Sequence, residues 1–192
     1  MPLLLTSRWG SQYVVTNSTN HQFMYNTPMY TYEHPRPAVT VDIVVFNLYT
    51  GLAYVLLIQR AAEPFIGMWA LPGGFVQMDE GLDEAARREL EEETGLKVTH
   101  LEQLYTFGRP DRDPRGRVIT VVYLVLLPES THKKVEGRDD AARADWFSVQ
   151  HLPTLAFDHA EILACAFACL DQKRHITKSL LHLYKVFICF YG

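Results

Sequence analysis

The chain has 192 residues, a formal net charge of −4 at pH 7 and 48% hydrophobic residues. A length of this order favours one domain with a sizeable core. The slightly acidic balance argues against a protein whose main partner is nucleic acid, because such proteins usually present a basic face.

No segment reaches the roughly 18 consecutive apolar residues that a membrane span requires. The apolar start, MPLLLTSRWG, is short and carries its only charged side chain, Arg8, after the apolar residues. A signal peptide has the opposite order, with its charges first. The sequence therefore predicts a cytoplasmic protein with no membrane partner.

Extended segments come first along the chain. Residues 38–48 predict a strand, and residues 51–60 predict its neighbour across a short turn that contains Gly51. Residues 69–77 predict a further extended stretch, interrupted by proline and glycine.

The pattern then changes to helical spacing. Residues 82–95 predict a helix that Gly95 ends, and residues 117–127 predict a buried strand. Residues 144–153 predict a short strand or turn, and residues 158–170 a second helix. Strands on both sides of one helix, followed by a closing helix, indicate an α+β fold in which a mixed sheet lies between helices.

Three parts of the chain follow from these elements: an N-terminal extension at 1–35, a domain at 36–172 and a tail at 173–192. The extension is rich in Tyr, Asn, Thr and Met and shows no steady hydrophobic period. The tail carries apolar residues without a clean stop, which is consistent either with packing on a neighbour or with disorder.

The predicted helix at 82–95 carries three acidic residues on one face. Glu89, Glu92 and Glu93 have the spacing i, i+3 and i+4, which brings their carboxylates together. Like charges so close repel each other and weaken an isolated helix. A compensating cation is therefore expected, and Mg²⁺ suits the site because hard cations prefer carboxylate oxygens.

An acidic run is also typical of a solvated helix face, and we accept that interpretation for Glu84 and Glu91. For the other three glutamates, spacing alone leaves both interpretations open. The opposite face, with Leu82, Ala86 and Leu90, is expected to anchor the helix against the sheet.

The residues around the three glutamates decide between a metal site and a solvated helix face. From Gly74 the chain follows the pattern G-x5-E-x7-R-E-L-x-E-E-x-G-L. Its nine fixed positions are Gly74, Glu80, Arg88, Glu89, Leu90, Glu92, Glu93, Gly95 and Leu96. This pattern resembles the Nudix box, without departure at any defining position. The resemblance implies the Nudix fold, and it implies a metal-dependent hydrolase that cleaves the pyrophosphate of a nucleoside diphosphate linked to another moiety.

By position in the box, the resemblance implies that Glu89, Glu92 and Glu93 are catalytic residues that hold the metal, Mg²⁺ or alternatively Mn²⁺. Glu80 resembles the upstream glutamate that assists metal binding. Arg88 resembles the arginine that orients a neighbouring carboxylate, and we include it in the catalytic set. The family's general base lies either in the box or on a later loop, and the sequence leaves that choice open.

Other segments resemble the branch of the family that handles ADP-ribose. They are residues 34–46, 59–96, 108–127 and 155–163. We therefore expect conversion of ADP-ribose to AMP and ribose 5-phosphate. The alternatives are another nucleoside diphosphate derivative (NADH, a nucleotide sugar or a dinucleotide), or a weakly active ADP-ribose-sensing module. The same segments resemble the sensor domains of Nudix regulators of NAD synthesis. In those regulators a winged-helix DNA-binding domain follows the Nudix domain, and the segment after Leu170 is too short to form one. An enzyme is therefore expected.

Substrate contacts are predicted at several further positions. The loop at 108–117 concentrates four arginines: Arg109, Arg112, Arg115 and Arg117. Guanidinium groups suit phosphate oxygens, so we predict that Arg109 and Arg117 bind substrate, the alternative being a hairpin whose charges pair locally. Arg60 follows an apolar strand and is predicted to reach the phosphates, the alternative being a surface ion pair. Gly74 is predicted to line the site where a side chain would obstruct the approach to the helix.

Two aromatic residues and the start of the last predicted helix have two interpretations each. Trp69 and Phe75 are placed to stack on an adenine, although core packing is the commoner role of such residues. Asp158 and His159 are interpreted as capping the helix, and His159 is not assigned to catalysis. The resemblance also implies a homodimer.

Overall fold

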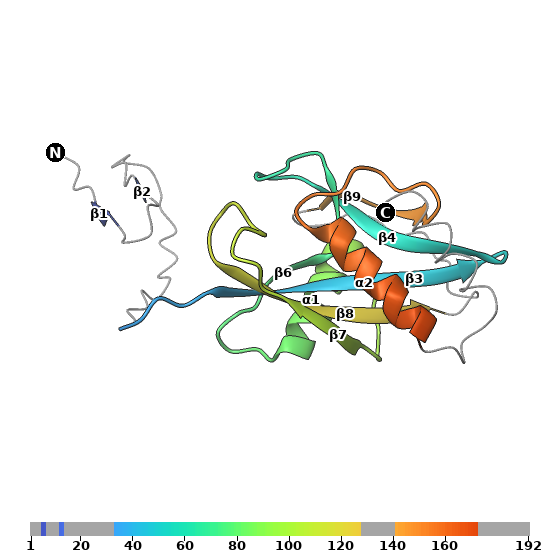
Figure 1. Cartoon of the computed structure of the whole chain (residues 1–192), viewed down its shortest axis with the longest axis horizontal. Helices are drawn as coiled ribbons and strands as arrows, with labels where there is room; N and C mark the ends of the chain where they lie inside the picture. Colours follow the sequence, from blue (N-terminus) through green and yellow to red (C-terminus); the bar gives the residue numbers. More distant parts are fainter. Residues whose placement is uncertain (1–4, 7–11, 14–32, 128–140, 173–192) are drawn as a thin grey trace. The chain divides into compact units, whose positions relative to one another are not determined.

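The computed structural model describes residues 5–6, 12–13, 33–127 and 141–172 (Figure 1). The chain forms two compact units, Met1–His34 and Pro35–Gly192. The first unit contains the antiparallel pair β1 (Leu5–Thr6) and β2 (Gln12–Tyr13). The tail predicted at 173–192 and most of the predicted extension lie outside the described residues.

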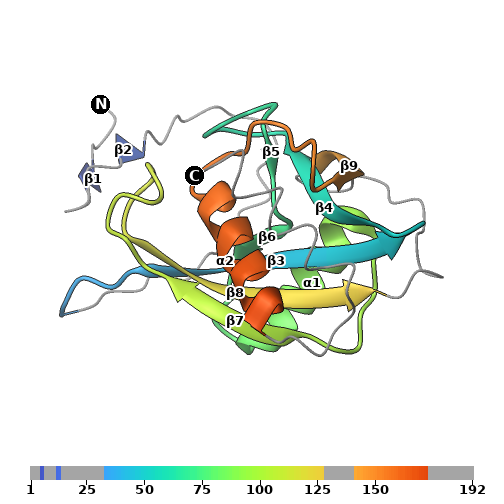
Figure 2. The same ribbon diagram turned by 45° about the vertical axis from the view of Figure 1, so that its right-hand side comes forward.

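The second unit is built on a mixed sheet with strand order β5–β4–β3–β8–β7, in which β6 also pairs with β3 and β9 with β4. Its strands are β3 (Ala38–Tyr49), β4 (Leu52–Arg60), β5 (Trp69–Ala70), β6 (Gly73–Phe75), β7 (Glu102–Phe107), β8 (Val118–Leu127) and β9 (Ala141–Ser148). The pairing of β3 with β8 is parallel, from Ala38 opposite Val118 to Asn47 opposite Leu127, and the two strands run side by side in Figure 2. The other pairings of the described strands are antiparallel.

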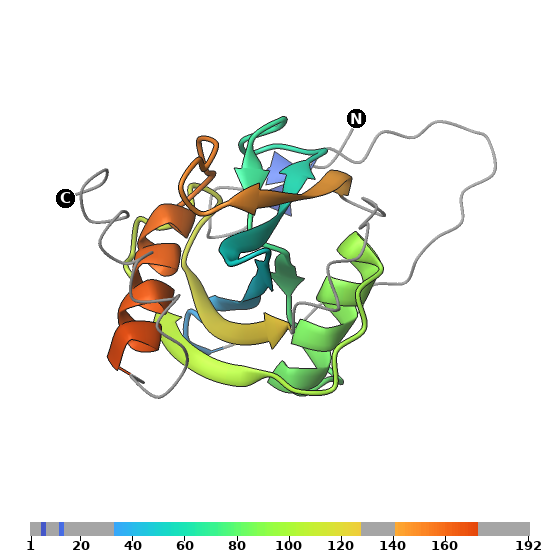
Figure 3. The same ribbon diagram turned by 90° about the vertical axis from the view of Figure 1, so that its right-hand side faces the viewer.

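One helix covers each face of this sheet. Figure 3 shows α1 (Leu82–Thr94) on one side of the sheet and α2 (His159–Gln172) on the other. Along β3, Val44 and Phe46 belong to the core cluster that includes α2. Ile43 and Val45 belong to the cluster that includes α1. Because both faces are buried, the strand reads as a continuous apolar run. The predicted α+β arrangement, a mixed sheet between helices, is confirmed.

Helix α1 begins and ends close to the positions predicted from the sequence. At its start, the backbone N–H of Gly81 donates to the Glu84 carboxylate at 2.8 Å. At its end, Gly95 adopts a left-handed conformation with φ 70° and donates its N–H to the Glu91 carbonyl oxygen at 2.8 Å. This is the C-terminal geometry that glycine accommodates without a Cβ clash.

One expectation requires correction, and one strand was not expected. Leu82 is 37% exposed as the first residue of α1, so the helix is anchored by Ala85, Ala86 and Leu90, all with 0% exposure. Strand β7 was not predicted, because most of its side chains are exposed and it lacks an apolar run.

No helix in the described part of the chain is long and apolar enough to cross a membrane.

The difference between Leu90 and Leu82 gives a test of how α1 packs. Leu90→Ala should lower the free energy of unfolding by about 2–5 kcal/mol, because it leaves a cavity between helix and sheet. Leu82→Ala should lower it by less than about 1 kcal/mol. Equilibrium urea denaturation of both variants measures the difference, and equal losses would contradict the described packing.

Candidate functional site

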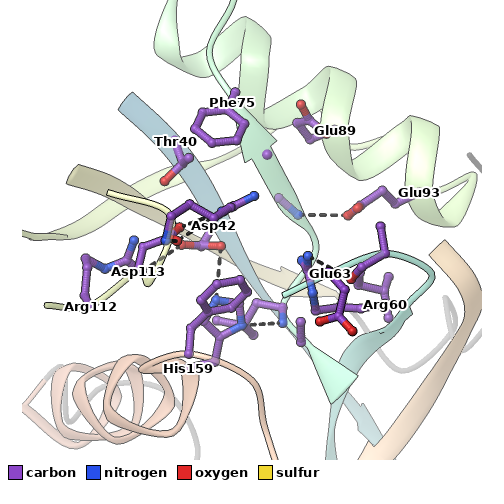
Figure 4. Close-up of a pocket in the computed structure, with 18 of the residues that line it drawn as sticks. Thr40, Asp42, Arg60, Glu63, Phe75, Glu89, Glu93, Arg112, Asp113 and His159 are labelled. Carbon is purple, nitrogen blue, oxygen red and sulfur yellow. Dashed lines mark hydrogen bonds and ion pairs between the residues drawn. The ribbon is translucent and has the colours of Figure 1, made fainter. Parts of the chain in front are cut away.

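A cavity of about 520 Å³ lies where α1, the strands β3 to β6, the loop between β7 and β8 and the start of α2 meet (Figure 4). Figure 4 shows Glu89 and Glu93 of α1 at one side of this cavity and Arg60 and His159 at the other. Acidic and basic side chains from segments distant in the sequence therefore face one space.

The carboxylates of α1 form one wall of the cavity. Glu93 is buried, and its Oε2 accepts a hydrogen bond from the Gly73 backbone N–H at 2.9 Å. Glu89 packs against Gly74, where an added Cβ would lie 2.5 Å from Glu89 Oε1. Glu89 can occupy this space because Gly74 has no side chain. Gly74 also lines the cavity.

Arg88 holds several carboxylates at once. It binds Glu80 through two hydrogen bonds, at 2.6 and 2.8 Å. Its Nη1 also donates to Glu89 at 2.8 Å and to Glu92 at 2.9 Å. The hydrogen bond from Arg88 keeps the pKa of Glu80 below its usual value, and the same contact raises the pKa of Arg88. Glu80 and Glu92 do not line the cavity but are joined to Glu89 through this one guanidinium.

Burial raises the pKa of Glu89; Arg88 opposes the shift, and the charges of Glu92 and Glu80 add to it. A carboxylate in this position is stabilised as an anion by a nearby cation. Oxygen donors of this kind suit a hard divalent ion, and those of Glu89 and Glu93 border the cavity. As the side chains are arranged, no group of three His, Cys, Asp or Glu residues in the described ranges converges to hold a metal. Arg88 instead binds oxygens of Glu80, Glu89 and Glu92, while Glu93 accepts a hydrogen bond from the Gly73 backbone.

A buried charge cluster forms the floor of the cavity. Arg112 binds Asp158 through two hydrogen bonds at 2.7 and 2.9 Å, and its Nη2 lies 3.5 Å from Asp42 Oδ2. Asp42 Oδ2 also accepts a hydrogen bond from the Thr120 hydroxyl at 2.7 Å. All four residues are buried. The cluster connects the central strand β3, the loop between β7 and β8, and the start of α2.

His159 lies beside this cluster and is also buried. Its Nδ1 accepts a hydrogen bond from the Leu71 backbone N–H at 2.8 Å, so that nitrogen carries no proton. Its Nε2 lies 3.5 Å from Asp42 Oδ1. Burial lowers the pKa of His159, although Asp42 and Asp158 oppose the shift. These contacts give His159 a structural role in the floor, as a neutral imidazole whose Nε2 proton faces Asp42.

The arginines predicted to bind substrate lie in different places. Arg60 lines the cavity. Arg109 does not: its side chain is 54% exposed and pairs with Asp111 at 2.9 Å and with Glu161 at 3.1 Å. Arg117 also lies off the cavity lining, and its Nη1 donates to the Val118 carbonyl oxygen at 3.4 Å.

Sequence reasoning missed Asp42, Asp113 and Phe157, and it named Arg112 and Arg115 only as members of the arginine-rich loop, although all five line the cavity. One available signal was Asp42, the single charged residue within the apolar strand at 38–48, since a buried charge requires a partner. Nothing in the sequence ranked the four arginines of the loop. Of the two aromatic residues considered for stacking, Trp69 packs on Phe147 with ring centroids 4.5 Å apart. Phe75 is 45% exposed and lines the cavity.

Asp158, just before α2, and Glu161, in its first turn, provide a matched test of the buried cluster. Asp158→Asn should lower the free energy of unfolding by about 3–5 kcal/mol, because it leaves the buried Arg112 charge without its main partner. Glu161→Gln removes one of the two partners of the exposed Arg109 and should leave the unfolding midpoint close to that of the wild type. Equilibrium denaturation checks both, and a tolerant Asp158→Asn variant would contradict the role given to the cluster.

Comparisons with known proteins cover this region. A family model described as NUDIX domain matches residues 36–165, which include every residue that lines the cavity. The ADP-ribose pyrophosphatase of Methanocaldococcus jannaschii is 42% identical over 127 residues, 66% of this chain and 71% of that protein. The ADPR responsive transcriptional repressor NtrR of Acinetobacter baylyi is 37% identical over 149 residues, 76% of this chain but only 59% of the repressor.

Solved structures show the same similarity. A MutT/nudix family protein from Enterococcus faecalis superposes with a TM-score of 0.69 at 34% identity, covering 81% of this chain and 70% of that one. The NUDIX domain of Shewanella oneidensis NrtR, complexed with ADP ribose, superposes with a TM-score of 0.67 at 33% identity, covering 71% and 90%.

Proposed function

Because the chain belongs to the Nudix family, we propose that it hydrolyses the pyrophosphate bond of ADP-ribose to give AMP and ribose 5-phosphate. The observation that carries this proposal is that Glu89 and Glu93 of the box line the same cavity as Arg60 and Arg115. Such a cavity offers carboxylates for a cation and guanidinium groups for phosphate oxygens. The M. jannaschii pyrophosphatase and the ADP-ribose complex of the S. oneidensis domain support ADP-ribose over other nucleoside diphosphates.

The proposed cofactor is Mg²⁺, with Mn²⁺ as the alternative, held by Glu89, Glu92 and Glu93 with assistance from Glu80. When bound, the cation neutralises phosphate charge and lowers the pKa of the attacking water. Arg88 contributes by fixing the orientation of the neighbouring carboxylates, since it binds three of them at once.

The remaining work falls to positioning, which is the main demand of displacement at phosphorus. The hydrogen bond between Gly73 and Glu93 ties α1 to β6, so the acidic wall keeps its place relative to the substrate. Arg60 attracts the phosphates from the other side, and Gly74 leaves room beside Glu89. A carboxylate that is not occupied as a ligand takes the proton of the attacking water. Substrate binding by Arg109 and Arg117 stays a prediction from the sequence.

A second candidate function is ADP-ribose sensing with little turnover. It is favoured by the similarity to the A. baylyi repressor, because that similarity covers 76% of this chain and the similarity to the pyrophosphatase covers 66%. Turnover at ordinary enzymatic rates, together with no gel shift of promoter DNA, would exclude this function. Three further statements stay predictions from the sequence: that the protein has no nucleic-acid partner, that it forms a homodimer, and that it is cytoplasmic.

The proposed function is tested by incubating a substrate panel with the protein and Mg²⁺ and separating the products, AMP and ribose 5-phosphate in the case of ADP-ribose, by chromatography. The panel contains ADP-ribose, NADH, diadenosine polyphosphates, nucleotide sugars and nucleoside triphosphates. We expect a clear preference for ADP-ribose. Preference for another compound would replace the substrate, and no turnover of any compound would favour the sensing function.

The same assay tests the ligand assignment. Glu93→Gln and Glu92→Gln should each reduce turnover by roughly 100-fold or more without unfolding the protein, because each removes a charged ligand. Glu91→Gln is the matched control on the same helix: Glu91 pairs with Lys97 at the surface, and its loss should change turnover little. Near-normal activity of either ligand variant would show that the assignment is wrong.

A further inference from the structure

The short segment between β5 and β6 is held by side chains from both helices. It runs from Leu71 through Pro72 to Gly73, the first residue of β6. The Gly73 backbone N–H donates to Glu93 Oε2 of α1 at 2.9 Å. The Leu71 backbone N–H donates to Nδ1 of His159, the first residue of α2, at 2.8 Å. The two helices cover opposite faces of the sheet (Figure 3), so this segment connects them through two amides that are only two positions apart.

The backbone between these two amides has little freedom. Proline fixes its own φ at about −65° and restricts the residue before it to extended conformations. The Pro72 carbonyl oxygen also accepts a hydrogen bond from the Ile43 N–H of β3 at 2.8 Å. A Cβ added at Gly73 would lie 2.2 Å from the Val41 carbonyl oxygen, so the segment lies close against the central strand. A shift of the backbone at Leu71 is therefore transmitted to Gly73.

The imidazole of His159 is itself held in one orientation. The ring is buried, and burial lowers its pKa, which favours the neutral form. Because Nδ1 accepts the Leu71 N–H, the proton of the neutral ring lies on Nε2, which is 3.5 Å from Asp42 Oδ1. Asp42 is the residue of β3 that lies opposite Gly73 in the sheet. The ring thus contacts the segment at Leu71 and faces the strand position that pairs with Gly73.

The Leu71 amide needs an acceptor from the protein. Leu71 is 1% exposed, and a buried backbone N–H without a partner is costly. Among the residues that the structure describes, His159 supplies that acceptor. Removing it leaves the donor unsatisfied, which favours movement of the segment toward solvent. Such a movement would displace the Gly73 N–H from the Glu93 carboxylate, so the contact does more than fill space in the core.

We propose that His159 is a positioning residue for Glu93. It fixes the segment from Leu71 to Gly73, and through the Gly73 N–H it sets the place of the Glu93 carboxylate. Figure 4 shows His159 and Glu93 on opposite sides of the cavity, each with its dashed contact to the backbone between them. The role requires no proton transfer, because the lone pair of Nδ1 is engaged by Leu71. The inference deepens the proposed function and rests on it for the role of Glu93 as a ligand.

Backbone amide exchange of the full chain, followed by NMR, tests the contact directly. His159→Phe keeps a ring and removes the acceptor, so the Leu71 and Gly73 amides should exchange roughly tenfold faster relative to the amides of β8. His159→Asn keeps an acceptor, because its Oδ1 takes the position of Nδ1, and should leave both amides slow. Tyr123→Phe is the matched control: it removes the 2.6 Å hydrogen bond to Asp83, away from the segment, and should leave both amides slow as well.

Metal binding and kinetics test the consequence at Glu93. Without substrate, His159→Phe should bind Mn²⁺ roughly tenfold more weakly by electron paramagnetic resonance, as is typical when a group that orients a ligand is lost. With Mg²⁺, kcat for ADP-ribose should fall by a similar factor and KM should change much less. His159→Asn should restore most of the Mn²⁺ affinity and of kcat. A general loss of packing would not be rescued by this smaller side chain, which keeps only the acceptor.

The outcomes distinguish this positioning role from the proposed function. Wild-type exchange at Gly73 or wild-type Mn²⁺ binding in His159→Phe, or equal losses in His159→Phe and His159→Asn, would overturn it.

If His159→Phe does not fold, the ring nitrogen shifts of the wild type decide together with His159→Asn. A proton on Nδ1 would overturn the role, and an unprotonated Nδ1 with slow Leu71 and Gly73 amides in His159→Asn would support it. Exchange needs no substrate, so His159-dependent exchange at Gly73 in a protein that does not hydrolyse ADP-ribose would support the positioning role and remove the proposed reaction.

Discussion

The ion pair between Arg112 and Asp158 is a buried link between separate parts of the fold beneath the cavity. Its partners come from the loop between β7 and β8 and from the start of α2, and Asp42 of the central strand lies close to the same guanidinium. Burying these charges is costly unless every one of them is paired. The pairing therefore fixes the relative positions of the strand, the loop and the helix. Asp113, Arg115 and Phe157 flank these anchor residues in the chain, so their placement depends on the pair.

Charged side chains lie on two opposite sides of the cavity, mainly acidic on one side and basic on the other. On the α1 side, one arginine is shared among three glutamates, which leaves negative charge in excess. On the opposite side, Arg60 and Arg115 lie over the ring of Phe157, and Arg115 is also paired with Asp113. The proposed substrate, a diphosphate with a divalent cation, fits this arrangement, because carboxylates suit a cation and guanidinium groups suit phosphate oxygens.

The parts of the site that were predictable from the sequence are those in which neighbours in space are neighbours in the chain. The glutamates of α1 are three and four residues apart, and the helix period alone brings them together. Gly95 ended the helix as expected because its left-handed conformation is a local property. The cavity floor is different: Arg112 and Asp158 are 46 positions apart, and Thr120 and Asp42 are 78 apart. No periodicity relates such residues, so the sequence alone did not separate Arg115, which lines the cavity, from Arg109, which pairs at the surface.

The parallel pairing of β3 with β8 also bears on how the molecule is made. During synthesis, β3 and β4 emerge first and are able to form their antiparallel hairpin at once. The other edge of β3 stays open until β8, ending at Leu127, has left the ribosome. Since β3 is apolar on both faces, the nascent chain carries an uncovered, strongly associating edge throughout the synthesis of α1 and β7. An open edge of this kind favours association with other chains until β8 covers it.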